Sequence, residues 1–159
     1  TVYMNIMFCG HSRLPDKETV SAELERSLIA IFMQARREGI KLDFLCGGYG
    51  DFDLLSAITV NNIKKRFNSV ESSIYFITPY ITQSYKQRNK QMLTIFDGII
   101  YPPIESVPYR FAINKRNEWM VKNSDIVIAY VKYSWGGAAR TLEYAKSRHW
   151  RRERRHSEP

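Results

Sequence analysis

Short apolar runs alternate along the chain with longer stretches in which apolar residues recur every three or four positions. The apolar runs cover residues 2–9, 42–46, 74–78 and 126–131. The amphipathic stretches cover residues 17–38, 51–67, 109–123 and 138–150. Buried strands that alternate with amphipathic helices are typical of proteins in which helices cover both faces of a parallel sheet. We therefore predict a three-layer α/β/α sandwich with a mainly parallel sheet.

Local signals set the expected limits of some of these elements. Asp16 is a good N-cap for the first helix, and Gly39 stands where a left-handed residue commonly ends one. The section from 80 to 108 is less regular. We expect a short polar helix over 83–92 and a short strand or extended loop over 98–104.

The composition is that of a globular protein, with 159 residues of which 44% are hydrophobic and 25% are charged. No repeat or linker divides the chain, so we expect one domain over residues 1–149, followed by a flexible basic tail over 150–159. No apolar run approaches the roughly 20 residues of a membrane-spanning helix, and no secretory signal is visible. The two cysteines do not form a CxxC pair. We therefore expect a cytoplasmic protein without a membrane partner.

Half of the net charge of +8 lies near the C-terminal end of the sequence, where residues 146–159 include six basic and two acidic side chains. A run of arginines can bind the phosphate backbone of a nucleic acid, and such binding weakens with salt. A charged end can also simply be a solvated terminus that aids solubility, and we favour this interpretation.

Unusual sequences follow each predicted strand. They are Cys9-Gly10-His11-Ser12-Arg13, Gly47-Gly48-Tyr49-Gly50-Asp51-Phe52-Asp53, Thr78-Pro79-Tyr80 and Ser134-Trp135-Gly136-Gly137-Ala138-Ala139-Arg140-Thr141. Ligands of open parallel sheets bind beyond the carboxyl ends of the strands, so these segments should share one rim. The residues that we predict at this site are Gly10, His11, Arg13, Gly47, Gly48, Gly50, Asp51, Asp53, Pro79, Tyr80, Asn117, Gly136, Gly137, Arg140 and Thr141.

The two glycine pairs predict the kind of ligand. Glycine has no Cβ, so it permits positive φ and lets a ligand approach main-chain N–H groups closely. A helix that begins directly afterwards directs free N–H groups and a positive dipole end at the same place, which suits phosphate. Bends at Gly47 and Gly136 would form a two-sided cradle for a nucleotide, although a tight turn without a ligand is the alternative. Neither bend matches the dinucleotide-binding or triphosphate-binding glycine motifs.

Polar side chains at this rim have candidate roles. Arg13 and His11 can contact phosphate, although His11 can equally be a hydrogen-bonded turn residue. Asp51 and Asp53 can cap the second helix, and one of them can accept a hydrogen bond from a ribose hydroxyl. Arg140 in the first turn of the last helix is unfavourable unless an anion is near.

Three further side chains could take part in catalysis. Glu143 can act as a general base, or it can pair with an arginine. Cys9 and Cys46 are more typical of small buried thiols than of nucleophiles. We expect no metal site and no cofactor.

These motifs together resemble the SLOG superfamily, a Rossmann-like group that includes the "lonely guy" phosphoribohydrolases and the DNA-processing protein DprA. Small bacterial and phage members of the YpsA type are the most similar. The resemblance extends to about residue 148 and rests on the segments 10–13, 47–53, 116–120 and 136–143. It implies a Rossmann-like fold of the SLOG type.

The phosphoribohydrolases of this superfamily have an Arg-Lys pair followed by Met, and then a Pro-Gly-Gly-x-Gly-Thr-x-x-Glu loop. The positions in this chain that match are Arg116, Met120, Gly136, Gly137 and Glu143. The positions that depart from the pattern are Asn117, Trp135, Ala139 and Arg140. The resemblance implies that binding of a nucleotide-like ligand is better preserved in this chain than catalytic activity.

The favoured function is therefore binding of a nucleotide or nucleotide-derived ligand, by a protein that senses or sequesters it. One alternative is hydrolysis of the N-glycosidic bond of a nucleoside 5′-monophosphate, with Glu143 assisting and Arg116 holding the phosphate. Another is single-stranded DNA binding, as in DprA. Many Rossmann-like proteins add a strand after the last helix, and a bare sheet edge in its place would favour a homodimer.

Overall fold

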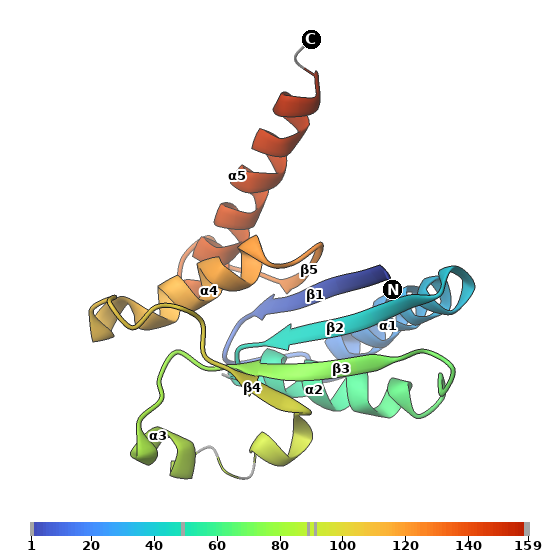
Figure 1. Cartoon of the computed structure of the whole chain (residues 1–159), viewed down its shortest axis with the longest axis horizontal. Coiled ribbons are helices and arrows are strands. Elements are labelled where there is room, and N and C mark those ends of the chain that lie inside the picture. Colours follow the sequence, from blue (N-terminus) through green and yellow to red (C-terminus); the bar gives the residue numbers. More distant parts are fainter. Residues whose placement is uncertain (1, 49, 89, 91, 158–159) are drawn as a thin grey trace.

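Five parallel strands form one sheet at the centre of this computed structural model (Figure 1), which describes residues 2–48, 50–88, 90 and 92–157, with the backbone alone for 88, 92–93 and 149–157. The strands are β1 (Val2–Gly10), β2 (Ile40–Cys46), β3 (Ser72–Ile77), β4 (Gly98–Ile100) and β5 (Ile126–Tyr130). Their order is β4-β3-β2-β1-β5, and every neighbouring pair is parallel. The predicted α/β class and parallel sheet are confirmed.

Helices cover the two faces of this sheet (Figure 1). The helices α1 (Lys17–Glu38) and α2 (Gly50–Lys64) pack on one face, and α4 (Ala112–Lys122) and α5 (Gly137–Ser157) pack on the other. The connections hold a short helix, α3 (Gln83–Arg88), and two 3₁₀ turns, η1 (Met92–Ile95) and η2 (Tyr109–Phe111).

The central strand β1 shows why both faces are covered. Ile6 and Phe8 belong to the core beneath α1 and α2, whereas Met7 and Cys9 belong to the core beneath α4 and α5. Successive side chains of a strand point to opposite faces, so a strand with no polar position in this stretch must be buried on both sides. All four side chains are at most 5% exposed.

The order in which strands are added to the sheet reverses next to β1. From β1 the strands β2, β3 and β4 are added outward on one side, and β5 then returns to the other side of β1. The connections after β1 and β5 consequently leave toward opposite faces and open a crevice between them. This is the place where ligands bind in open α/β sheets.

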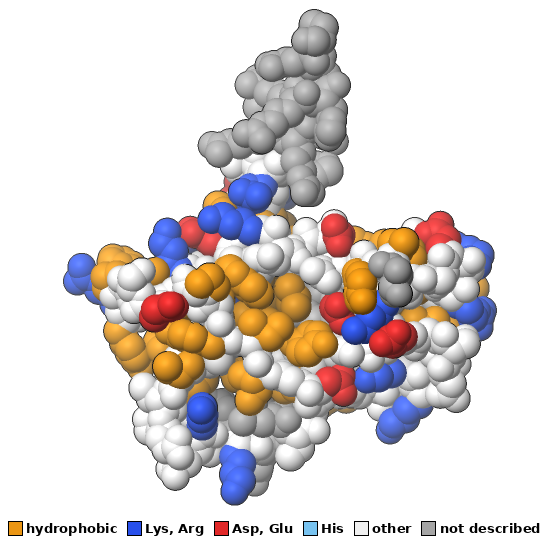
Figure 2. Space-filling view, viewed as in Figure 1, with side chains coloured by type: hydrophobic (Ala, Val, Ile, Leu, Met, Phe, Trp, Pro, Cys, Tyr) orange, Lys and Arg blue, Asp and Glu red, His pale blue; other side chains and the backbone are white. Residues whose placement is uncertain are grey.

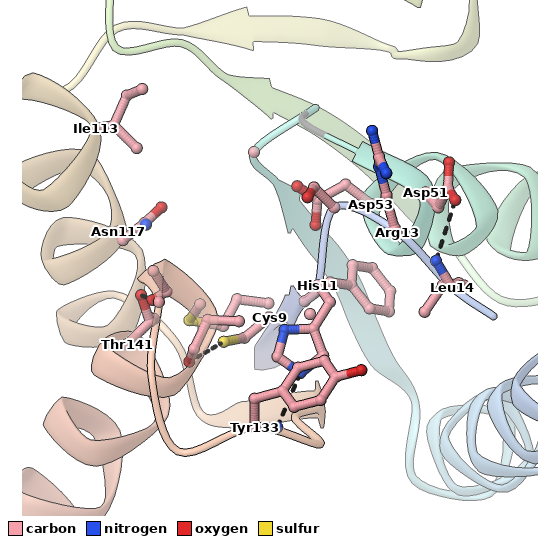
Figure 3. Close-up of a pocket in the computed structure, with 18 of the residues that line it drawn as sticks. Cys9, His11, Arg13, Leu14, Asp51, Asp53, Ile113, Asn117, Tyr133 and Thr141 are labelled. Carbon is pink, nitrogen blue, oxygen red and sulfur yellow. Dashed lines mark hydrogen bonds between the residues drawn. The ribbon is translucent and has the colours of Figure 1, made fainter.

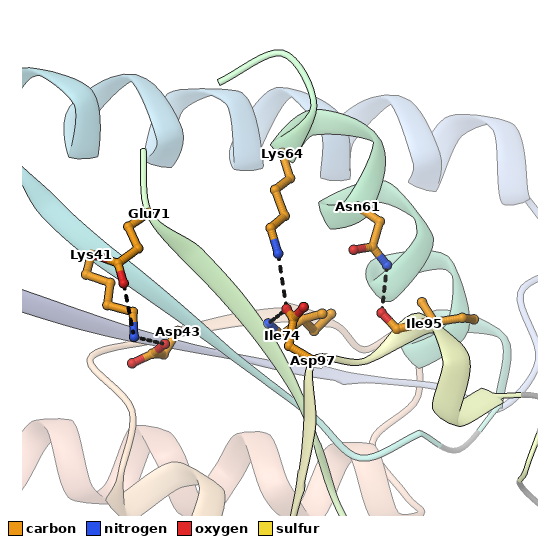
Figure 4. Close-up of polar contacts among 8 residues, drawn as sticks. All are labelled: Lys41, Asp43, Asn61, Lys64, Glu71, Ile74, Ile95 and Asp97. Atoms are coloured by element: carbon orange, nitrogen blue, oxygen red, sulfur yellow. Dashed lines mark hydrogen bonds and ion pairs between the residues drawn. The ribbon is translucent and has the colours of Figure 1, made fainter. Parts of the chain in front are cut away.

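The connection that leads into β4 is held by one carboxylate. Asp97 accepts hydrogen bonds from the backbone N–H of Ile74 and from Lys64 Nζ, at 2.8 and 3.1 Å. Asn61 donates to the carbonyl oxygen of Ile95 nearby, at 2.9 Å (Figure 4). These contacts attach the segment that leads into β4 to β3 and α2.

The element limits differ most from the expected ones in three places. The helix expected over 83–92 ends at Arg88, and the strand expected over 98–104 ends at Ile100, where the two prolines that follow cannot donate to a strand ladder. The last helix continues to Ser157 instead of ending near Trp150, because the added residues include good helix formers.

The surface has apolar and basic regions. Figure 2 shows hydrophobic side chains gathered near the middle of one face, with most Lys and Arg side chains toward its margins. In the described part of the chain, no helix combines the length and apolar composition that a bilayer span requires. Among the described residues, no strand lies beside the outer edge of β5, on which the expected homodimer depends. The homodimer stays a prediction.

Two glycines with the same backbone conformation give a matched test of packing in this fold. Gly39 and Gly48 have φ of 67° and 74°. No described atom lies within 4 Å of a Cβ built on Gly39, but a Cβ on Gly48 would collide with the Phe76 ring. We expect Gly39→Ala to lower the free energy of unfolding by about 1–2 kcal/mol. Gly48→Ala should cost at least about 1 kcal/mol more, measured by urea denaturation; equal losses would contradict this.

Candidate functional site

A cleft of about 1060 Å³ opens at the carboxyl ends of β1, β2 and β5, at the reversal point of the sheet (Figure 3). Its walls come from the loop after β1, the start of α2, one face of α4 and the start of α5. Such a volume is sufficient for a ligand of nucleotide size.

Most of the predicted site residues meet in this cleft. Those that line it are Gly10, His11, Arg13, Gly47, Asp51, Asp53, Arg116, Asn117, Gly136, Gly137 and Thr141. The predicted residues that are not among its lining are Gly48, Gly50, Pro79, Tyr80, Arg140 and Glu143. The two glycine bends therefore meet at one cleft, but the segment after β3 does not reach it.

The N-terminus of α5 opens onto this cleft. Gly136 has φ of 93°, which favours glycine, and its carbonyl oxygen accepts the N–H of Arg140 at 3.1 Å. Among the described residues, no atom lies within 4 Å of a Cβ built on Gly136 or Gly137. The first N–H groups of a helix have no partner within it, and its positive dipole end attracts anions. This corner of the cleft can therefore hold a phosphate or carboxylate.

The glycine-rich segment after β2 has a different structural role. A Cβ on Gly47 would lie 3.2 Å from Arg116 Cζ, and a Cβ on Gly48 would overlap the Phe76 ring. The Phe52 side chain occupies the place of a Cβ at Gly10, and Ser12, through its backbone and Cβ, occupies it at Gly50. These glycines admit neighbouring parts of the protein, whereas the expectation was that they admit a ligand. Tyr49 of the same motif lies outside the described residues.

Arg116 lies in the wall of the cleft as a buried clamp. It is 2% exposed, and its Nη1 donates to the carbonyl oxygens of Gly47 and Ile77, at 3.0 and 2.8 Å. Its Nε donates to Oδ1 of Asn117 at 2.8 Å. The guanidinium thereby attaches the ends of β2 and β3 to α4. These contacts favour a structural role for Arg116 over the suggested role of holding a phosphate.

His11 connects the two loops that flank the reversal point. Its Nε2 accepts the backbone N–H groups of Lys132 and Tyr133, at 2.7 and 3.3 Å. An acceptor Nε2 has no proton, so this hydrogen bonding assigns the proton to Nδ1. Nε2 cannot then donate to a phosphate, so His11 is a hydrogen-bonded turn residue whose Nδ1–H is the one donor of its ring.

The acidic and basic residues of the β1–α1 loop also divide into two roles. Asp51 accepts the backbone N–H of Leu14 at 3.1 Å and lies 3.8 Å from Lys17 Nζ, so it holds this loop instead of capping α2. Figure 3 shows Asp53 on the α2 side of the cleft. Arg13 is exposed and has no hydrogen bond or ion pair among the described residues. Its charge remains available to an anionic ligand.

Comparison with known proteins supports the observed fold. No family model matches the chain. It is 27% identical over 146 residues to an uncharacterized SPbeta prophage-derived protein, YoqJ, of Bacillus subtilis, covering 82% of this chain and 84% of that protein. Its structure is similar to that of DNA processing protein A (DprA) from Streptococcus pneumoniae, with a TM-score of 0.59 and 13% identity. That match covers 92% of this chain and 48% of the DprA chain, so this chain spans about half of DprA.

The chain therefore has a Rossmann-like α/β fold, which it shares with DprA. A second structural match, the structural genomics target TM1055, has a TM-score of 0.49 and 13% identity, and covers 91% of this chain and 69% of that one. At 13% identity the similarity to DprA concerns the fold, and the site must be judged from its own residues.

The two thiols of this fold are unsuited to nucleophilic chemistry. Burial raises the pKa of Cys9 to about 12, with a smaller contribution from the charge of Asp53. Cys9 Sγ also donates to the carbonyl oxygen of Ala138 at 3.2 Å. Burial raises the pKa of Cys46 well above its usual value. Both therefore remain protonated at neutral pH, and they are the small buried thiols that the sequence suggests.

Glu143 lies on the exposed side of α5. Thr141 lines the cleft and is 7% exposed, whereas Glu143 is exposed and is absent from the cleft lining. Residues two positions apart on a helix are about 200° apart around its axis, so the two side chains diverge. In this structure Glu143 is therefore directed away from the described lining of the cleft, and its role in hydrolysis stays a prediction.

Two aromatic residues that line the cleft are missing from the predicted site residues. Tyr133 and Trp135 line the cleft and stack on each other, with ring centroids 5.2 Å apart and an interplanar angle of 21°. The sequence contained a signal for both residues, because they lie in the short segment between the last strand and the Gly136-Gly137 bend, which was predicted to lie at the rim. It was overlooked because most tyrosines and phenylalanines were assigned to strands or to the core.

Arg116 can be tested as a clamp by comparison with an exposed arginine. Arg116→Met leaves the carbonyl oxygens of Gly47 and Ile77 without this donor, so the free energy of unfolding should fall by at least about 2 kcal/mol. Arg140→Met on the exposed side of α5 should change it by about 0.5 kcal/mol or less. Chemical denaturation followed by circular dichroism measures both. Equal, small effects would show that Arg116 is not structural.

Proposed function

We propose that the protein binds a nucleotide or nucleotide-derived ligand in this cleft. The observation that supports the proposal most strongly is the start of α5, where Gly136 and Gly137 leave main-chain N–H groups open to a large cleft at the reversal point of the sheet. The fold shared with DprA is consistent with the proposal but does not identify a ligand.

The ligand would contact the cleft walls through complementary groups. A phosphate at the start of α5 would face the exposed guanidinium of Arg13 across the cleft. Asp53 and Asn117 line the same cleft and offer oxygen and nitrogen atoms to sugar hydroxyls. The absence of Glu143 from the lining favours a protein that senses or sequesters this ligand over one that hydrolyses it.

A second candidate function is single-stranded DNA binding. Exposed rings beside cations favour it, and Tyr133 and Trp135 are 44% and 70% exposed, with Lys132 Nζ 6.0 Å from the centroid of the Tyr133 ring. The described fold positions these rings at a single cleft rather than along an extended groove. We therefore place this candidate second. A short oligonucleotide that binds more tightly than any mononucleotide would reverse the order.

The proposal predicts saturable binding that depends on phosphate. In calorimetry and thermal shift experiments, at least one of a set of nucleoside 5′-monophosphates, ADP-ribose and cyclic dinucleotides should bind, and the matching nucleoside should bind more weakly. Arg13→Ala removes a charged contact, so the affinity should fall about tenfold. Arg37→Ala, at the exposed C-terminal end of α1, is the matched control and should leave the affinity unchanged.

Two outcomes would contradict this function. One is a folded protein that shows no shift with any of these ligands. The other is an affinity that falls equally in the Arg13 and Arg37 variants, since binding would then reflect only the overall positive charge.

A further inference from the structure

The loop between β5 and α5 presents the two exposed aromatic rings at the mouth of the cleft. Trp135 is 70% exposed, and Tyr133 stacks against it. We call Tyr133 and Trp135 the aromatic platform. An exposed tryptophan side chain does not gain the free energy that burial of its apolar surface would give. Two stacked, exposed rings at a cleft therefore indicate that the planar ring of a ligand covers them.

The platform is attached to the body of the protein before any ligand arrives. The hydrogen bonds from Lys132 and Tyr133 to His11 Nε2 hold the loop against the end of β1. The His11 ring also lies 5.1 Å from the Tyr133 ring, at an angle of 48°, and contacts Tyr130 edge-on at 6.0 Å. Figure 3 shows His11 and Tyr133 together at one side of the cleft. A fixed ring binds at a lower entropic cost than a mobile one.

The platform lies directly beside the proposed phosphate position. Trp135 and Gly136 are consecutive, with Cα atoms about 3.8 Å apart, so an anion at the start of α5 lies within one nucleotide length of the indole ring. Few of the cleft residues are large flat rings, and α4 contributes the apolar side chains of Ile113 and Met120 to the lining. A ligand with both an anion and a planar ring would satisfy both features of this corner.

We propose that Trp135, supported by Tyr133, is the stacking surface for the base of the bound ligand, which makes it the residue that selects nucleotides over sugar phosphates. This inference rests on the proposed function, because it requires the phosphate to occupy the start of α5. Stacking uses the π-face that every base has, so the platform selects for a base without specifying one base by hydrogen bonds. The larger overlap of a purine makes purines the tighter ligands.

The test compares a ligand with a base and a ligand without one. Dissociation constants for adenosine 5′-monophosphate and ribose 5-phosphate are measured by calorimetry on the wild-type protein, Trp135→Ala, Trp135→Phe and Tyr3→Ala. Tyr3 is 57% exposed at the opposite end of β1 and is the matched aromatic control. Trp135→Ala should weaken adenosine 5′-monophosphate about tenfold or more and change ribose 5-phosphate less than about twofold. Trp135→Phe and Tyr3→Ala should retain most of the affinity.

A fluorescence measurement separates stacking from a purely structural role. Adenosine 5′-monophosphate should quench the tryptophan emission of the wild-type protein, and the quenching should disappear in Trp135→Phe even though that variant still binds. Thermal melting of each variant confirms that it is folded, which is expected because the indole is exposed.

The outcomes distinguish this inference from the proposed function. If Trp135→Ala binds adenosine 5′-monophosphate as tightly as the wild type, or loses both ligands equally, the stacking role is wrong while the proposed function stands. If the wild-type protein binds neither probe, both the proposed function and the stacking role fail for nucleoside monophosphates.

Discussion

The hydrogen bonds of the buried Arg116 guanidinium determine the position of the cleft. They join the carbonyl oxygens at the ends of β2 and β3 to α4, the helix that forms one wall. A buried guanidinium is stable only where acceptors surround it, so α4 has little freedom to shift relative to the sheet. Ile113 and Asn117, on the same helix, are thereby fixed at the cleft. The wall that contacts a ligand is in this way built from interactions that are internal to the protein.

The two glycine-rich bends look equivalent in the sequence, but they have different roles in the proposed site. Gly47 and Gly48 lack side chains because Arg116 and Phe76 fill the space, so this bend supports the wall. Gly136 and Gly137 face open space, so this bend is the one available to a ligand. The aromatic platform beside the second bend, fixed by His11, adds a surface of a different chemical kind. The proposed site is therefore asymmetric, with an anion-binding part beside a planar aromatic part.

The sequence was sufficient for features that depend on neighbouring residues. Short apolar runs predicted four of the strands, helical spacing predicted the four long helices, and Gly39 ends α1 in the left-handed conformation. Features that depend on distant residues were not accessible. The acceptors of Arg116 lie 69 and 39 positions away, and His11 bonds an N–H group 121 positions away. The outward direction of Glu143 depends on the rotation of α5 against the sheet, which helical spacing alone does not determine.

The central claim is that an anionic group binds at the start of α5. A crystal structure of the protein with adenosine 5′-monophosphate tests it most directly. The account predicts phosphate oxygens within about 2.7–3.2 Å of main-chain nitrogens at residues 136–138, with the base against Trp135. A phosphate bound elsewhere, for example on the basic C-terminal half of α5 while the start of this helix contacts only water, would contradict it.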